Sequence, residues 1–203
     1  LAGLGVATDK VSVTADPVLA LPQADLAAGR AILDSLSMQG EGPLIGFAVR
    51  EWQGREHFKN IFAAVADRLV QERGARILFL PMQCPDDLRA SKLVASRMKQ
   101  PHATLEAKPD TGELLSIVGN LDLLVGVRLH ALIFAAVMDV PFIGVSYDPK
   151  IDRFLETLAE TPVGNLESLT AESLFARIEQ SLADQPARQR RRQRVDELRR
   201  QAL

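Results

Sequence analysis

The chain has 203 residues, which suits one large domain or two very small ones. Hydrophobic residues make up 47% and charged residues 25%, so the chain can bury a substantial core and does not belong to the disordered class. The net charge of −2 and the 5% aromatic content give no indication of nucleic-acid binding, and none is expected. Cys84 is the only cysteine, which excludes an intrachain disulfide framework and favours a reducing, cytoplasmic setting.

Short apolar runs alternate with helical patterns along the first half of the chain. A short strand is expected over 11–14, a weak helix over 26–37 and a buried strand over 44–49. An amphipathic helix follows and is predicted to end at Gly74; its apolar face is formed by Phe58, Ile61, Phe62, Val65 and Leu69. The next elements are a strand over 75–80, a helix over 85–98 and a short strand over 103–106.

The second half continues the same alternation, with the helices and strands 110–118, 121–127, 129–138, 141–146 and 149–158. Unbroken apolar strands that are each followed by a helix are typical of a parallel sheet covered on both faces. The expected fold class is therefore α/β, with a doubly wound, mostly parallel, Rossmann-like sheet. We assign residues 1–184 to this domain.

Residues 185–203 form a basic segment that differs from the rest of the chain. They contain seven arginines and two acidic residues, a net charge of +5, whereas the whole chain carries −2. The simpler interpretation is a solvated terminal helix or tail, and the alternative is weak contact with an anionic membrane surface. No apolar run approaches the ~20 residues that span a bilayer, so membrane contact would be peripheral, at the inner face.

Candidate site residues follow the predicted strands, because ligands of open parallel sheets bind at the carboxyl ends of the strands. Cationic or titratable side chains come after three of them: Arg50, Arg128, His130 and Lys150. Arg128 and His130 fall at a helix start, where free N–H groups and the helix dipole favour an anion. Gly126, just before them, would let a ligand approach the strand end closely.

Each of these residues also has a purely structural interpretation. Arg128 could pair with a structural acid, and His130 could simply start a helix. Asp148 suits an N-cap position, and Asp86 and Asp87 suit the first turn of a helix. Trp52 is interpreted as a core residue rather than as a sugar platform.

The sequence lacks the usual signatures of nucleotide and metal sites. It contains no glycine-rich phosphate loop of the G-x-G-x-x-G or G-K-[ST] type. The three histidines, His57, His102 and His130, are scattered, so no metal site is expected.

Four stretches resemble the polysaccharide pyruvyl transferase family, CsaB-like members in particular. The most specific is VGVRLHALIFAAVMDVPFIGVSYDPKIDRFL, and VTADPVLAL, IGFAVREW and LFLPMQCPDDL occur in the family's order. The resemblance extends to about Leu158. Family members are longer, with a further N-terminal half in a GT-B-like arrangement, so the resemblance implies that this chain corresponds to the C-terminal domain of a two-domain enzyme.

The resemblance implies a reaction and a set of site residues. The family transfers a pyruvyl group from phosphoenolpyruvate to two hydroxyls of one sugar, forming a cyclic ketal on a cell-wall polysaccharide precursor, lipid-linked in bacterial members. By resemblance, Arg128 and His130 are expected to be catalytic. Arg50, Arg128, Leu129 and Lys150 are expected to bind substrate. No metal or redox cofactor is expected.

Two other functions remain open from the sequence. One is the nucleotide-sugar-binding domain of a GT-B glycosyltransferase, although the E-x7-E spacing of many retaining members is absent: Glu106 and Glu113 are one residue too close. The other is a non-catalytic glycan-binding module, against which the intact pair of Arg128 and His130 counts.

Overall fold

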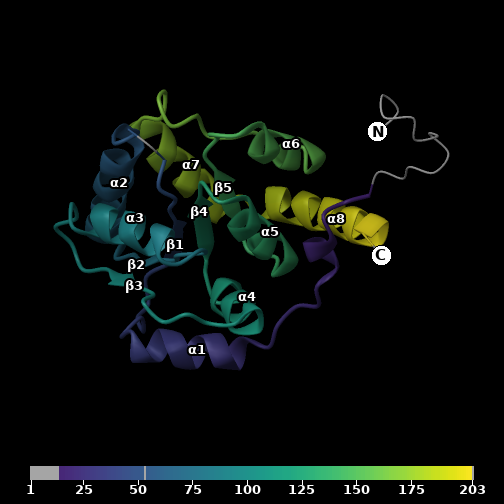
Figure 1. Cartoon of the computed structure of the whole chain (residues 1–203), viewed down its shortest axis with the longest axis horizontal. Coiled ribbons are helices and arrows are strands. Elements are labelled where there is room, and N and C mark those ends of the chain that lie inside the picture. Colours follow the sequence, from purple (N-terminus) through teal and green to yellow (C-terminus); the bar gives the residue numbers. More distant parts are fainter. Residues whose placement is uncertain (1–13, 53, 203) are drawn as a thin grey trace.

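Five parallel strands form the centre of the computed structural model, which describes residues 14–52 and 54–202 (Figure 1). Their order is β3-β2-β1-β4-β5, and their bounds are β1 Leu44–Ala48, β2 Arg76–Phe79, β3 Ala103–Thr104, β4 Leu123–Gly126 and β5 Phe142–Gly144. The order reverses between β1 and β4, which lie side by side at the centre. This reversal is the switch point at which open parallel sheets bind ligands.

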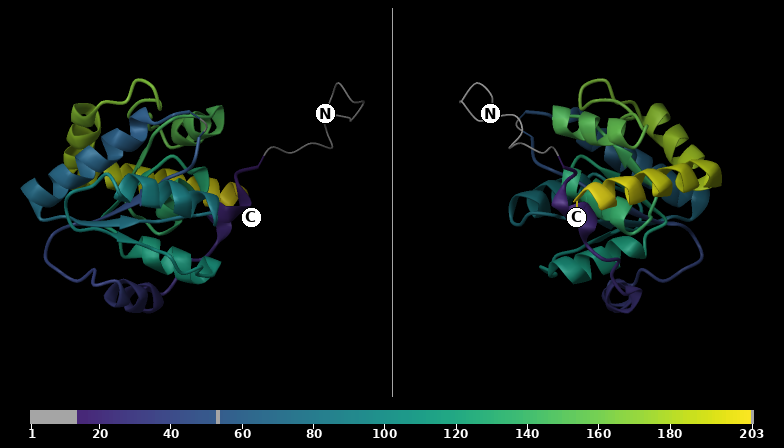
Figure 2. Two further views of the ribbon diagram at one scale, coloured as in Figure 1. Left: turned by 60° about the vertical axis from the view of Figure 1, so that its left-hand side comes forward. Right: turned by 90° about the vertical axis from the view of Figure 1, so that its right-hand side faces the viewer.

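Helices cover both faces of the sheet, as the two views of Figure 2 show. One face carries α2 His57–Arg73, α3 Asp86–Ala95 and α7 Ala171–Ala183. The other carries α1 Leu26–Ser35, α4 Thr111–Gly119, α5 Leu129–Val137, α6 Pro149–Thr157, α8 Gln185–Ala202 and the short 3-10 helix η3 Pro17–Ala20. The expected doubly wound α/β class is confirmed.

The apolar strands divide their side chains between two cores. Ile45 and Phe47 of β1 point to the α2 side, whereas Leu44 and Ala48 point to the α5 side. All four are buried because both faces of the sheet are covered. The Phe47 ring packs edge-on against Phe62 of α2, with 5.4 Å between ring centroids.

Local sequence signals set several helix ends as expected. Gly74 ends α2 with a left-handed φ of 60°, which glycine adopts at little cost. The Asp148 carboxylate caps α6, and Pro149 is its first residue. Asp110 and Glu113 form a reciprocal capping box at the start of α4.

One helix was not expected from the sequence, and one expected strand lies almost entirely outside the described residues. Helix α7 was not expected, although Leu174, Phe175 and Ile178 give it a buried face. The strand expected over 11–14 falls outside the described residues except for Thr14. None of the helices in the described ranges is long and apolar enough to cross a bilayer.

Helix α8 holds the basic segment against the domain, beside α5 (Figure 1). Val195 is buried in the core, and the largely buried Arg191 pairs with Glu160 at 2.7 Å. Arg199 donates a hydrogen bond to the carbonyl oxygen of Leu19 in η3, at 3.0 Å. The expected terminal helix therefore exists, and it packs on the sheet domain rather than extending into solvent.

Candidate active site

A cleft of about 490 Å³ lies beyond the carboxyl ends of the strands, at the switch point. Its wall combines residues that follow β1, β2, β4 and β5 with the start of α4. All five residues expected from the sequence to form the site line it: Arg50, Arg128, Leu129, His130 and Lys150. Tyr147, Gln83 and Met82 line it as well.

Arg128 stands at the N-cap position of α5 and is held in place by a buried carboxylate. One of its terminal nitrogens pairs with Asp87 of α3, whose side chain is 0% exposed, and lies 3.3 Å from the Gln83 amide oxygen. The structural interpretation of Arg128 is thus partly correct, since it does pair with an acid. Its buried Nε has no hydrogen-bond partner among the described residues, so the guanidinium keeps one buried N–H unpaired beside the cleft.

Asp87 was expected only to support the first turn of α3, and it does more than that. One carboxylate oxygen accepts hydrogen bonds from the backbone N–H groups of Met82 and Gln83, at 3.2 and 2.9 Å. The other oxygen binds Arg128. Asp87 therefore joins the loop after β2 to the start of α5. A pairing across 41 residues leaves no local signal in the sequence.

Arg50 lies beside two aromatic rings just after the end of β1. Its guanidinium carbon is 5.5 Å from the Trp52 ring centroid and 5.3 Å from that of Tyr147, and it hydrogen-bonds to the Tyr147 hydroxyl. Arg50 forms no ion pair with any described residue. It is thus a cation of the cleft that no carboxylate of the described residues contacts directly, although its charge acts on Asp148.

The remaining expected residues occupy the start of α5 and α6. Leu129 packs partly against the core, and His130 is exposed in the first turn of α5. The Lys150 ammonium is 3.6 Å from Asp148. The pKa of Asp148 is lowered chiefly by the hydrogen bond from the Lys150 backbone N–H, and also by the charges of Lys150 and Arg50.

Two expectations about this region are wrong. Trp52 is 37% exposed, not a core residue, because the loop after β1 places it at the surface beside Tyr147. Gly126 is buried within the fold: a Cβ there would lie 3.3 Å from a Leu132 methyl and 3.5 Å from the Ala48 Cβ. Its small size therefore serves the packing of β4 against β1 and α5, rather than the approach of a ligand.

The other histidines lie outside the cleft. His57 Nε2 is 2.9 Å from the Leu169 carbonyl oxygen, and His102 Nδ1 is 3.0 Å from that of Gln100. In residues 14–52 and 54–202, no three His, Cys, Asp or Glu side chains gather in a way that could hold a metal ion.

The sequence pattern that defines the polysaccharide pyruvyl transferase family matches residues 1–149. The chain belongs to this family. The match covers most of the cleft and ends one residue before Lys150. No curated protein matches the chain.

Solved structures show that the fold is shared with GT-B-like enzymes. The chain resembles Staphylococcus aureus MnaA in its UDP co-structure (TM-score 0.69, 13% identity, 94% of this chain and 51% of that one). It resembles Methanocaldococcus jannaschii UDP-GlcNAc 2-epimerase in complex with UDP-GlcNAc and UDP (TM-score 0.67, 16% identity, 97% of this chain and 57% of that one). It also resembles Escherichia coli ADP-heptose lipopolysaccharide heptosyltransferase II (TM-score 0.61, 14% identity, 79% of this chain and 53% of that one). The chain thus spans about half the length of these proteins.

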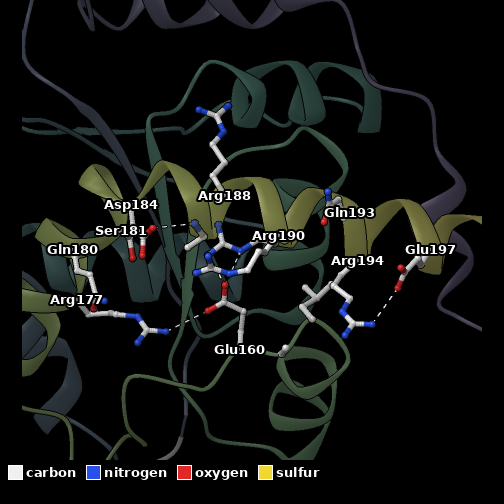
Figure 3. Close-up of a pocket in the computed structure, with 14 residues that line it drawn as sticks. Glu160, Arg177, Gln180, Ser181, Asp184, Arg188, Arg190, Gln193, Arg194 and Glu197 are labelled. Carbon is white, nitrogen blue, oxygen red and sulfur yellow. Dashed lines mark hydrogen bonds and ion pairs between the residues drawn. The ribbon is translucent and has the colours of Figure 1, made fainter.

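A second hollow, of about 550 Å³, lies between α7 and α8 (Figure 3). It is rich in arginine, but acidic side chains bind several of these groups. Glu160 accepts from Arg177 at 3.3 Å and from Arg191 at 2.7 Å, and Arg194 pairs with Glu197 at 3.2 Å. The pair of Glu160 and Arg191 fastens α8 to the domain, whereas Arg194 and Glu197 both belong to α8. The cleft at the strand ends is therefore the candidate active site.

Proposed function

We propose that the cleft is the phosphoenolpyruvate site of a polysaccharide pyruvyl transferase. The observation that carries the proposal is the convergence of Arg50, Arg128 and Lys150 with the N-terminus of α5 on one cleft. Phosphoenolpyruvate carries a phosphate and a carboxylate, and guanidinium groups and helix N-termini both bind such anions. Arg50 lacks a carboxylate partner among the described residues, so it is the first candidate for this clamp.

The proposed reaction moves the three-carbon unit to two hydroxyls of one sugar. A proton adds to the methylene carbon of phosphoenolpyruvate, and the oxygen of the first sugar hydroxyl bonds to the resulting cationic C2. The bond between C2 and the phosphate oxygen then breaks, and the second hydroxyl oxygen closes the ring. The two hydroxyl protons balance the proton added to carbon and the proton taken up by phosphate.

His130 is the proposed proton-transfer group. It is exposed in the first turn of α5 and lines the cleft together with both arginines. A histidine in this place can supply the proton to the methylene carbon and accept one from a hydroxyl. Arg128, oriented by Asp87, would hold the donor and stabilise charge as phosphate departs.

The proposed acceptor is a sugar of a cell-wall polysaccharide precursor. This precursor is proposed to be linked to a lipid at the inner face of the membrane. The proposed chemistry needs no redox or metal cofactor. Membrane contact through α8 is part of this proposal, because several arginines of that helix are exposed: Arg190, Arg192, Arg194 and Arg200.

Thermal denaturation with candidate donors tests the proposal against the nucleotide-sugar alternative. Phosphoenolpyruvate should raise the Tm of the protein, because a ligand that binds only the folded state stabilises it. UDP-GlcNAc serves as the comparator, since similar folds bind it. Stabilisation by UDP-GlcNAc and none by phosphoenolpyruvate would favour a glycosyltransferase-type domain.

A further inference from the structure

An exposed tryptophan lies beside Arg50 and Tyr147, two residues that line the cleft. Trp52 is 37% exposed and is the only tryptophan of the chain. The other large apolar side chains with comparable exposure among the described residues, Leu26 and Leu93, lie on the helices α1 and α3. Trp52 instead lies in the loop after β1, two residues after Arg50, which lines the cleft.

Tyr147 supports the indole from the β5 side. The two ring centroids are 4.7 Å apart with an angle of 56° between the planes. Tyr147 itself lines the cleft and is partly buried in the core. The two rings therefore form an aromatic surface next to the cleft, with Tyr147 on the cleft wall and Trp52 beside it.

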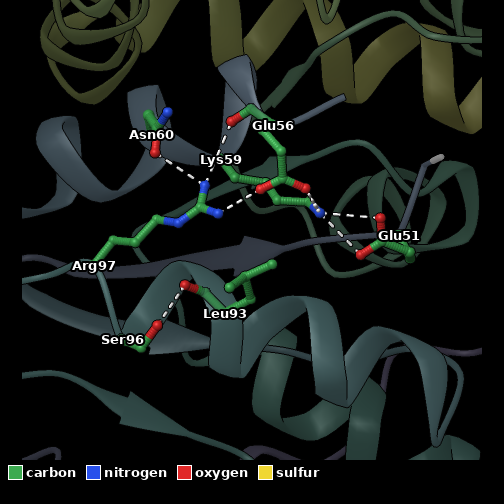
Figure 4. Close-up of polar contacts among 7 residues, drawn as sticks. All are labelled: Glu51, Glu56, Lys59, Asn60, Leu93, Ser96 and Arg97. Carbon is green, nitrogen blue, oxygen red and sulfur yellow. Dashed lines mark hydrogen bonds and ion pairs between the residues drawn. The ribbon is translucent and has the colours of Figure 1, made fainter. Parts of the chain in front are cut away.

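A buried lysine binds two glutamates that lie on either side of Trp52 in the chain (Figure 4). The Lys59 side chain is 0% exposed, and its ammonium lies 3.0 and 2.9 Å from the two Glu51 carboxylate oxygens and 2.8 Å from Glu56. Arg97, two residues after the end of α3, binds Glu56 and lies 2.9 Å from the Asn60 amide oxygen. Glu51 and Glu56 flank Trp52 in the chain, so one buried cation anchors the loop on both sides of the indole.

A binding surface needs side chains that are already in position before the ligand arrives, and these contacts of Lys59 meet that need. An aromatic side chain held in advance on a fixed loop loses little conformational entropy when a ligand packs on it. The exposed part of the indole does not stabilise the domain, because its apolar surface stays in water. The network thus holds in place a side chain that remains partly uncovered.

We propose that Trp52, supported by Tyr147, is the surface on which the pyranose ring of the acceptor sugar stacks. Pyranose rings present faces of C–H groups, which pack on aromatic rings, while their hydroxyls point outward from the ring edge. The inference rests on the proposed function: two hydroxyls of one sugar must reach C2 of the donor, so that sugar lies beside the cleft. Trp52 and Tyr147 form the aromatic surface that adjoins Arg50 there. Lys59 is a positioning residue for this surface.

Saturation-transfer NMR with simple glycosides tests the stacking surface directly. The probes are methyl β-D-galactopyranoside and methyl β-D-glucopyranoside, with sorbitol as a polyol that lacks a ring face. The wild-type chain should transfer saturation to the ring C–H protons of at least one glycoside more strongly than to sorbitol. Trp52→Ala should reduce that transfer by about threefold to tenfold, the scale of one aromatic contact. Trp52→Phe should retain most of it.

One control variant and three further outcomes separate this inference from its alternatives. Arg30→Ala should leave the glycoside signal in place, because Arg30 is an exposed residue of α1 that lies outside the cleft. If Trp52 served only to hold Arg50, Trp52→Ala would weaken phosphoenolpyruvate binding and leave the glycoside signal unchanged, and the inference would be overturned. A wild-type signal no stronger for either glycoside than for sorbitol would overturn it as well. If the wild type gives the glycoside signal but does not bind phosphoenolpyruvate, the proposed donor is refuted and the sugar surface is not.

The positioning role of Lys59 has its own readout. Lys59→Met should weaken the glycoside signal while Trp52 is still present, because the loop loses its anchor on both sides. A general loss of stability would also lower the Tm, so the signal is compared at a temperature where both proteins are folded. An unchanged glycoside signal in the folded variant would remove Lys59 from the proposal.

Discussion

The carboxylate of Asp87 is fully buried and binds the guanidinium of Arg128, which lies 41 residues further along the chain at the start of α5. The same carboxylate accepts two backbone hydrogen bonds from the loop after β2. One residue thereby fixes the position of the arginine that the family resemblance assigns to the active site. The pair is therefore expected to matter for both stability and donor binding.

Replacing Asp87 should destabilise the protein strongly. Asp87→Ala leaves the largely buried Arg128 cation and two N–H groups without their partner, and removing one member of a buried pair costs about 3–5 kcal/mol. Urea denaturation measures this loss. The matched control is Asp86→Ala, which removes an exposed carboxylate paired only with Arg89 and should cost no more than about 1 kcal/mol. Equal losses in the two variants would contradict the assigned role of Asp87.

Much of the fold follows from sequence patterns that are local. The apolar runs at 44–49 and 121–127 predicted two central strands because a strand buried on both faces needs apolar residues at every position. Gly74 and Asp148 predicted helix ends because their roles depend only on adjacent backbone. Helix α7 was missed, although the residues that bury its face are spaced as in any amphipathic helix.

Part of the site was also predictable, because the positions of some of its residues follow from the strand pattern. Arg50, Arg128 and His130 could be placed together because parallel strands bring their carboxyl ends to one edge. Asp87 and Lys59 could not, since their roles depend on which partners the tertiary fold supplies. The exposure of Trp52 was also misjudged: nothing in the local sequence shows that Lys59 anchors its loop at the surface.

His130 is expected to act in proton transfer rather than in donor binding. His130→Gln should keep phosphoenolpyruvate affinity within about tenfold and lower turnover by roughly 10²–10⁴, the usual scale of general acid–base catalysis. Single-turnover rates of pyruvyl transfer by the full-length protein measure the effect. His102→Gln is the control, because His102 lies outside the cleft. A wild-type rate in His130→Gln would leave His130 as a residue that merely starts α5.

The loop anchor should respond to acid. Hydrogen bonds from Lys59 and then Arg97 lower the pKa of Glu56 below its usual value. A lowered folded pKa stabilises the protein above the unfolded glutamate pKa of ~4.3, and the stabilisation is lost as the pH falls through the folded pKa. The difference in unfolding free energy between wild type and Glu56→Gln should therefore be full at neutral pH and shrink below about pH 4.3.

Chemical denaturation as a function of pH checks this expectation. Glu41→Gln provides a control, because Glu41 is an exposed glutamate outside the network. A difference between wild type and Glu56→Gln that stays constant from neutral pH to pH 3 would contradict the role assigned to Glu56.

Membrane contact through α8 is best tested without deleting the helix, because Val195 and Arg191 are part of the packed domain. Neutralising three exposed arginines with Arg190→Gln, Arg192→Gln and Arg200→Gln should weaken sedimentation with anionic vesicles at low salt by at least about tenfold, since each contributes roughly 1 kcal/mol near an anionic leaflet. A variant with Arg30→Gln, Arg89→Gln and Arg153→Gln removes the same charge elsewhere. Equal binding by both variants would rule out a specific role for α8.

Calorimetric titration of phosphoenolpyruvate into wild type, Arg50→Ala and Arg30→Ala tests whether this cleft is the donor site. Arg30 is an exposed arginine on α1, and its removal should leave donor affinity unchanged. Arg50→Ala should lower affinity by about 30-fold or more, because losing one partner of a desolvated charge contact costs on the order of 2–5 kcal/mol. Phosphoenolpyruvate that fails to bind the wild type, or that binds Arg50→Ala as tightly as wild type, would contradict the assignment of this cleft as the donor site.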